Sequence, residues 1–163
     1  MQSQRIRVVV MGVSGSGKST IGALLADALD VPFTDGDALH PAANVEKMSH
    51  GIPLDDDDRR PWLDAVAGVL VHDDGVVACS ALRRAYRDRI RALVPDAFFL
   101  ELTAPAEVLA ARMTRRPGHF MPVALLESQL ATLEDLQPDE RGIRVDADEP
   151  PVEIVDATRE ALA

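Results

Sequence analysis

The sequence predicts one α/β domain, in which helices cover both faces of a parallel sheet. Three observations support this fold class. Short β-branched apolar runs alternate with longer amphipathic stretches along the 163-residue chain, as in a parallel sheet with crossover helices. Residues 12–19 read Gly-Val-Ser-Gly-Ser-Gly-Lys-Ser and match the G-x-x-x-x-G-K-[ST] phosphate loop. That loop also joins an apolar run to an amphipathic stretch, which is its required structural context.

The phosphate loop is the chemical centre of the sequence. Residues 6–11 predict a buried strand before it, and apolar residues at helical spacing over 21–29 predict a helix after it. A helix N-terminus offers unpaired N–H groups and a positive dipole end to an anion. We therefore expect ATP phosphates to be bound by Gly12, Ser14, Gly15, Ser16, Gly17, Lys18, Ser19 and Thr20. Lys18 would reach the β- and γ-phosphates, and the Ser19 hydroxyl would ligate Mg²⁺.

Composition excludes several classes of partner. The net charge of −10 argues against nucleic acid and against an anionic membrane, because both would repel the chain. No apolar run approaches the ~18 residues of a membrane span, and Cys79 is the only cysteine, so a cytoplasmic protein is expected. Arginine outnumbers lysine by 15 to 2. This makes Lys47, like Lys18, a candidate site residue, although a surface role for it explains the pattern equally well.

A second short strand, at 31–34, runs into Asp35-Gly36-Asp37. Ligands bind at the carboxyl ends of parallel strands, so these carboxylates should lie beside the phosphate loop. Asp35 would hold Mg²⁺ through water, and Asp37 would contact the hydroxyl of the phosphoryl acceptor. The alternative is an ordinary Asp-Gly turn.

Residues 38–72 predict a helical segment that binds the substrate. Its first part contains His40 and Lys47 around a short helix near 44–48. The run Asp55–Asp58 resembles a metal site, but consecutive aspartates point in different directions. We expect them to complement the dipole of the next helix, whose apolar stripe includes Trp62 and Leu70.

A third buried strand over 76–79 leads into an arginine-rich helix. We expect its core face to consist of Leu82, Tyr86, Ile90 and Leu93. Arg83 and Arg87 are candidates to bind an anionic group, because guanidinium groups bind carboxylates and phosphates in a bidentate manner. A solvated helix face accounts for the other arginines of this helix.

The last third of the chain predicts two more strands, at 97–102 and 143–146, and a final helix over 152–162. Between the two strands, a helix begins at Pro105 and leads to a basic segment, about 112–123, that contains Pro117, Gly118 and Pro122. We interpret this segment as a lid that carries arginine to the transferring phosphoryl group. An ordinary connection between two helices is the alternative.

Several narrower motifs accompany the phosphate loop. They are Asp-Gly-Asp-Ala-Leu-His-Pro at 35–41, Asn-Val-Glu-Lys-Met at 44–48, Gly-Ile-Pro-Leu-Asp-Asp-Asp-Asp-Arg-Arg-Pro-Trp-Leu at 51–63, Ala-Cys-Ser-Ala-Leu-Arg-Arg-Ala-Tyr-Arg-Asp at 78–88 and Gly-His-Phe-Met at 118–121. With these motifs, nearly the whole chain resembles the gluconokinases of the phosphate-loop type, which are relatives of shikimate and adenylate kinases.

The resemblance implies a single P-loop kinase domain over 1–163, with strand order 2-3-1-4-5. It implies ATP-dependent phosphorylation of D-gluconate at its 6-hydroxyl. Asp37, His40, Lys47, Arg83 and Arg87 would surround the sugar acid, Arg116 and His119 would come from the lid, and Arg112 would stack on adenine. Lys18, Asp37 and Arg116 would be the catalytic residues.

Two other functions stay open at the level of sequence. One is a kinase for a different small acceptor, such as a shikimate-like acid or a nucleoside monophosphate. The other is a nucleotide-dependent switch, against which the dense polar segment 35–60 argues. The sequence also leaves a homodimer open.

Overall fold

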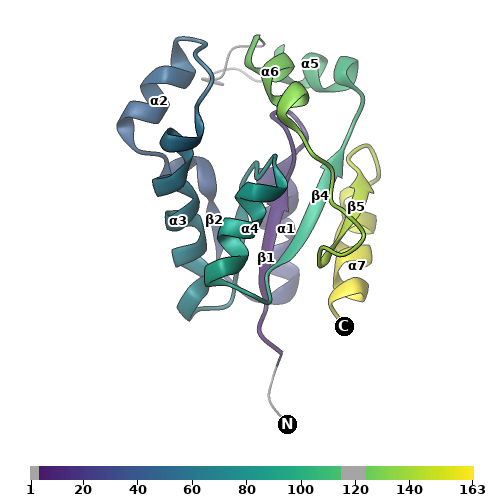
Figure 1. Cartoon of the computed structure of the whole chain (residues 1–163). Coiled ribbons are helices and arrows are strands. Elements are labelled where there is room, and N and C mark those ends of the chain that lie inside the picture. The colour runs from purple at the N-terminus through teal and green to yellow at the C-terminus, as the bar shows by residue number, and fades with distance from the viewer. Residues whose placement is uncertain (1–3, 115–123) are drawn as a thin grey trace.

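A parallel sheet of five strands forms the centre of the molecule (Figure 1). The computed structural model describes residues 4–114 and 124–163. The strands lie in the order β2-β3-β1-β4-β5, and every neighbouring pair is parallel, which confirms the predicted fold and order. Their bounds are β1 Arg7–Met11, β2 Phe33–Asp35, β3 Gly75–Ala78, β4 Phe98–Thr103 and β5 Gly142–Asp146.

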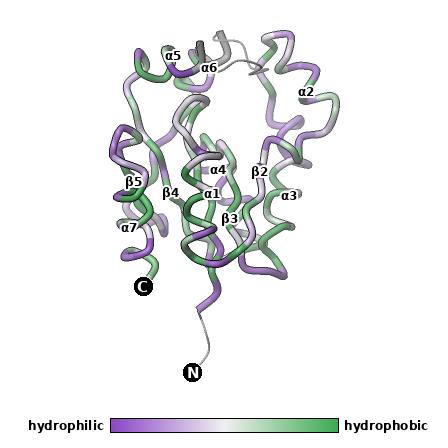
Figure 2. The backbone as a smooth tube through the Cα atoms, turned by 180° about the vertical axis from the view of Figure 1, so that it is seen from behind, coloured by the Kyte–Doolittle hydropathy of each residue, from purple (hydrophilic) through white to green (hydrophobic). Residues whose placement is uncertain are grey.

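Helices cover both faces of the sheet, as predicted. Figure 1 shows α3 and α4 on the near face, and Figure 2 shows α1 and α7 on the opposite face. Above the carboxyl ends of the strands lie α2 on one side and α5 and α6 on the other. The bounds are α1 Lys18–Leu29, the 3₁₀ helix η1 Gly36–Leu39, α2 Ala42–Ser49, α3 Asp56–His72, α4 Arg84–Leu93, α5 Ala106–Thr114, α6 Ala124–Thr132 and α7 Pro151–Leu162. Among the described residues, no helix has the length and apolarity to cross a membrane.

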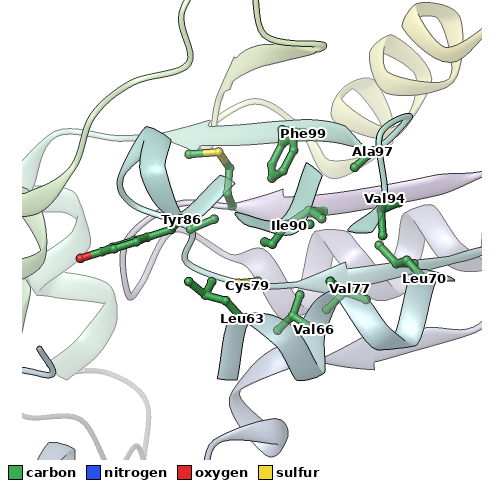
Figure 3. Close-up of a cluster of buried hydrophobic side chains, with 14 of the residues drawn as sticks. Leu63, Val66, Leu70, Val77, Cys79, Tyr86, Ile90, Val94, Ala97 and Phe99 are labelled. Carbon is green, nitrogen blue, oxygen red and sulfur yellow. The ribbon is translucent and has the colours of Figure 1, made fainter. Parts of the chain in front are cut away.

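The core consists of two layers, one on each side of the sheet. Alternate residues of β1 serve the two layers: Val8 and Val10 pack with α1 and α7, while Val9 and Met11 pack with α3 and α4. Burial on both faces explains why the central strand is a continuous apolar run and shows no alternation. In the layer that contains Val9 and Met11, side chains of α3 and α4 meet those of β3 and β4 (Figure 3).

The acidic run at 55–58 begins α3, as predicted. The Asp55 side chain accepts a hydrogen bond from the Asp58 backbone N–H, and the Asp58 side chain accepts one from Asp55. This reciprocal capping box satisfies N–H groups that have no partner within the helix. The remaining carboxylates of the run lie in the first turn, where the helix dipole favours negative charge.

The predicted core face of α4 is wrong in part. The helix begins at Arg84, so Leu82 is buried before it, and Leu93 is 50% exposed at its end. Tyr86, Arg87 and Ile90 form the buried face. The sequence pattern missed this because a charged side chain, Arg87, takes a core position.

Gly36 lies where the ends of β2 and β3 approach closely. A Cβ atom built at this position would stand 2.2 Å from the Ala78 carbonyl oxygen. The Gly36 carbonyl oxygen in turn accepts a hydrogen bond from the Trp62 indole N–H at 2.8 Å. The absence of a side chain therefore lets one backbone unit hold two strand ends and α3 together.

We predict that Gly36→Ala lowers the free energy of unfolding by about 1–3 kcal/mol, because overpacking forces backbone shifts. Gly68→Ala is the matched control: no atom lies within 4 Å of its added Cβ, and alanine favours a helix over glycine by about 0.5–1 kcal/mol. Urea unfolding of both variants measures the difference. Equal stability of the two would contradict the close approach at Gly36.

Candidate active site

The phosphate loop joins the end of β1 to the start of α1, as the motif predicts. Gly17 precedes the helix with φ 93°, a left-handed conformation that glycine adopts without strain. Gly17 has no side chain to cap this end of α1, so the N–H groups there can donate hydrogen bonds to an anion. Lys18 Nζ donates to the Val13 carbonyl oxygen at 3.1 Å, and the Ser14 N–H donates to Gln129 Oε1 of α6 at 2.7 Å.

Ser19 and Asp35 meet at the foot of the loop. The Ser19 hydroxyl donates to Asp35 Oδ2 at 3.2 Å, while Asp35 Oδ1 accepts from the Asp37 N–H at 3.0 Å. A hydroxyl and a carboxylate oxygen at this spacing fit Mg²⁺, which takes one or two protein oxygens and completes its shell with phosphate and water. The part of the chain that the structure describes holds no group of three or more metal-binding side chains, so such a shell would need those other ligands.

A pocket opens beside the phosphate loop, at the carboxyl ends of the central strands. It brings together Lys18, Asp37 and His40, three residues that the sequence predicted for one site. Side chains from α2, α3 and α6 complete its wall. The lining residues are Ser14, Lys18, Asp37, His40, Met48, Pro53, Leu54, Arg59, Trp62, Ser80, Leu82, Ser128, Gln129 and Thr132.

His40 is held by an aromatic stack and by one amide. Its ring lies parallel to that of Trp62, with 4.1 Å between ring centroids and 15° between planes. Asn44 Nδ2 lies 3.2 Å from His40 Nδ1. Burial, and then the charge of Arg59, lower the pKa of His40 to about 4, so its ring is neutral at physiological pH.

Lys47 lies in α2 and is absent from the pocket-lining residues. Its ammonium group donates to Asp58 Oδ2 at 2.8 Å, and this hydrogen bond raises the pKa of Lys47. The pair links α2 to the start of α3, so the structure places Lys47 beside the pocket as a connection between helices.

Arg59 lines the pocket, although it was not among the predicted site residues. Its guanidinium group donates to Tyr86 Oη at 2.9 Å and lies 5.0 Å from the centre of that ring. Arg83, which was predicted, is exposed at the N-terminus of α4. It lines a groove that adjoins the pocket, together with Arg59 and Tyr86.

Arg87 does not reach the pocket, which corrects its predicted place in the site. The side chain is fully buried, and its Nε and Nη2 bind Glu140 at 2.7 and 2.9 Å. Nη1 donates to the Ala81 carbonyl oxygen at 2.9 Å. Burial opposes ionisation of Glu140, but hydrogen bonds from Arg87, the Gln137 N–H and Arg91 outweigh it and lower the pKa of Glu140 to about 2. Arg87 is thus committed to a buried ion pair.

Arg112, at the end of α5, connects the phosphate loop with the loop that follows β5. It donates to the Gly15 carbonyl oxygen at 3.3 Å and to Asp148 Oδ1 at 2.8 Å. Its stacking on adenine stays a prediction. Arg116 and His119 lie outside the described residues, as does most of the predicted lid.

Comparisons with known proteins agree with this geometry. A family model described as shikimate kinase matches residues 14–156. The thermosensitive gluconokinase of Escherichia coli is 46% identical over 160 residues, which cover 94% of this chain and 86% of that protein. The chain belongs to the gluconokinase family. The gluconokinase of Gluconobacter oxydans is 48% identical over 154 residues, covering 88% of this chain and 84% of its own.

A solved gluconokinase structure extends the relation to three dimensions. The crystal structure of a gluconokinase from Sinorhizobium meliloti matches with a TM-score of 0.88 at 50% identity, and covers 98% of this chain and 93% of that one. The similarity therefore includes the sheet, the phosphate loop and the helices around the pocket.

In this gluconokinase-family chain, sequence reasoning missed Arg59 and the contribution of α6. Arg59 lies three residues before Trp62 and shares one face of a helix with it, but this spacing does not distinguish a pocket wall from a core. Gln129 gave no local signal. Its contact with the Ser14 N–H spans 115 residues of sequence.

We predict that Arg87→Met lowers the free energy of unfolding by about 3–5 kcal/mol, because it leaves a buried carboxylate short of its partner. Arg89→Met is the matched control. Its ion pair with Asp64 is exposed, and such pairs contribute about 0–1 kcal/mol. Urea unfolding measures both. A stable Arg87→Met protein with a raised KM for gluconate would contradict the structural role.

Proposed function

We propose that this protein transfers the γ-phosphoryl group of ATP to the 6-hydroxyl of D-gluconate, which gives 6-phospho-D-gluconate. One observation carries the proposal: Lys18 of the phosphate loop and Asp37 line the same pocket. A donor phosphate and an acceptor hydroxyl can therefore meet there. The similarity to gluconokinases across nearly the whole chain supports gluconate as the acceptor.

Phosphoryl transfer depends mainly on positioning and on charge stabilisation. The N–H groups at the start of α1 bind the ATP phosphates, and Lys18 exchanges its contact with the Val13 carbonyl for the β- and γ-phosphate oxygens. Asp37 orients the 6-hydroxyl and accepts its proton. Ser19 and, through water, Asp35 would hold Mg²⁺, which would supply positive charge to the phosphate oxygens. Arg112 stacks on the adenine, and Arg116 of the lid neutralises charge in the transition state.

The carboxylate end of gluconate needs cations away from the transferring phosphoryl group. Arg59 supplies one from the wall of the pocket, and Arg83 supplies a second from the adjoining groove. Tyr86 orients the Arg59 guanidinium group through a hydrogen bond and ring contact. His40 binds hydroxyl groups of the sugar chain, together with His119 of the lid.

Four further expectations stay predictions: the choice of acceptor, the cytoplasmic location, a homodimer and the lid. A different small acid as acceptor is separated from gluconate by a substrate panel with ATP consumption as the readout. The cytoplasmic location and a homodimer are tested by fractionation of the source cells and by light scattering. The lid role of residues 112–123 is tested by mutating Arg116.

We predict that the purified chain consumes ATP in the presence of gluconate and forms one equivalent of a gluconate phosphate. Lys18→Ala should lower kcat by on the order of 10²-fold or more, because a charge that stabilises the transition state is lost. A coupled ADP assay and phosphorus NMR of the product measure this. A slow hydrolysis that gluconate does not accelerate would favour the nucleotide-dependent switch.

We predict that Arg59→Ala raises the KM for gluconate by roughly 10- to 150-fold, since a charge-assisted hydrogen bond contributes about 1.5–3 kcal/mol. The KM for ATP should change little. D-glucitol keeps the open chain but lacks the carboxylate, so its KM should rise far less in this variant than the KM for gluconate. Arg89→Ala on the surface is the control. An equal effect on gluconate and D-glucitol would show that Arg59 does not bind the acid group.

A further inference from the structure

Asn44 is a buried amide beside the pocket, and both hydrogens of its side-chain nitrogen have partners. It is 3% exposed. Nδ2 donates to the Asp58 carbonyl oxygen at 2.9 Å and lies 3.2 Å from His40 Nδ1. A carbonyl oxygen can only accept, so the Asp58 contact identifies this atom as the amide nitrogen. The orientation of the amide is therefore fixed by the backbone of α3.

This orientation determines where the His40 ring carries its proton. An amide nitrogen has only hydrogens to offer, so His40 Nδ1 must accept. A neutral imidazole that accepts at Nδ1 carries its proton at Nε2. The protonated ring is disfavoured, because an N–H at Nδ1 would face the N–H of Asn44. Burial and the charge of Arg59 act in the same direction on the pKa of His40.

Stacking on Trp62 fixes the plane of the His40 ring, and the Asn44 contact favours the orientation within that plane in which Nδ1 faces the amide. Trp62 stacks on the ring at 4.1 Å, and the Trp62 indole is anchored to the Gly36 carbonyl. Among the described residues, none forms a hydrogen bond with His40 Nε2. The ring lines the pocket that also contains Asp37 and Lys18. A rigid, neutral N–H donor is thus available to a bound molecule.

We propose that Asn44 is a positioning residue that holds His40 as the neutral Nε2–H tautomer, so that His40 donates a hydrogen bond to a hydroxyl oxygen of the acceptor. The donor role rests on the proposed function. It follows that His40 is not the base of the reaction, because Nε2 already holds a proton. Asp37 is then the pocket group that accepts the proton of the attacking hydroxyl.

Several charged groups surround His40 and affect the protonation of its ring. Lys18, Asp37 and Arg59 line the pocket with it. Lys47 and Asp58 pair with each other beside Asn44. Nitrogen signals of labelled histidine report the protonation of the histidine rings themselves and not that of these five groups.

Nitrogen NMR of the full chain with ¹⁵N-labelled histidine tests the tautomer without substrate. The chain has four histidines. His40→Gln removes the signal of interest, and His50→Gln serves as the matched control on the exposed end of α2. We expect His40 to be neutral, with its proton at Nε2, throughout pH 5–8. A titration near pH 6.5, or a proton at Nδ1, would overturn the proposal.

Asn44→Asp reverses the polarity of the contact, since a carboxylate accepts from Nδ1–H and stabilises the imidazolium. We expect the midpoint of the His40 titration to rise by at least one pH unit relative to the wild-type chain. If the titration midpoint of His40 is unchanged in a folded variant, Asn44 does not determine the protonation of His40. Thermal unfolding is recorded first, because Asn44 also holds Asp58. If this variant does not fold, the wild-type tautomer and the His40 variants decide the proposal.

Kinetics of two His40 variants separate a donor from a base. Glutamine offers an amide N–H near the position of Nε2 but cannot accept a proton. We expect the gluconate KM of His40→Gln to stay within about 3-fold of wild type, and that of His40→Ala to rise by on the order of 3- to 10-fold. An equal loss of kcat of roughly 10²-fold in both variants would mark His40 as a base and refute the donor role.

The proposed function can fail separately. A wild-type chain that does not phosphorylate gluconate would refute that function and the donor role toward gluconate. The NMR result would still confirm or refute the tautomer that Asn44 imposes.

Discussion

The close approach of the β2 and β3 ends at Gly36 is the constraint on which the active site depends. It places Asp35 and Asp37 within reach of the phosphate loop, where the Ser19 hydroxyl binds Asp35. The Gly36 carbonyl also anchors the Trp62 indole, and Trp62 in turn carries the His40 ring. Asp35, Asp37 and His40 are therefore positioned by one backbone unit that has no side chain.

Among the residues that the structure describes, few cations face the pocket. Many arginines are paired with carboxylates at the surface, for example Arg5 with Asp74 and Arg89 with Asp64. Arg59 also lies 3.6 Å from Asp56, and its guanidinium group contacts the Tyr86 ring and hydroxyl at the wall of the pocket. A chain with a net charge of −10 can bind two anionic substrates because local positive charge and helix N–H groups outweigh the distant acidic surface.

The buried ion pair between Arg87 and Glu140 lies outside the pocket and connects elements that surround it. It ties α4 to the segment between α6 and β5, and α6 supplies Gln129 to the phosphate loop. Removal of Arg87 would leave the buried Glu140 carboxylate without its bidentate partner, which is far more costly than loss of a surface pair. The orientation of α6 over the pocket thus depends on a contact that binds no substrate.

The sequence by itself determined the parallel sheet, the phosphate loop and the acidic start of α3, because each depends on local periodicity or on residues a few positions apart. The strand-end rule also predicted that Asp37 lies beside the phosphate loop, and Asp37 and Lys18 line one pocket. Arg59 and Arg87 were decided only by the tertiary structure. Both are arginines on amphipathic helices, and their local patterns do not distinguish a pocket wall from a core. The difference comes from Glu140, which lies 53 residues from Arg87 in sequence and meets it only when the chain folds.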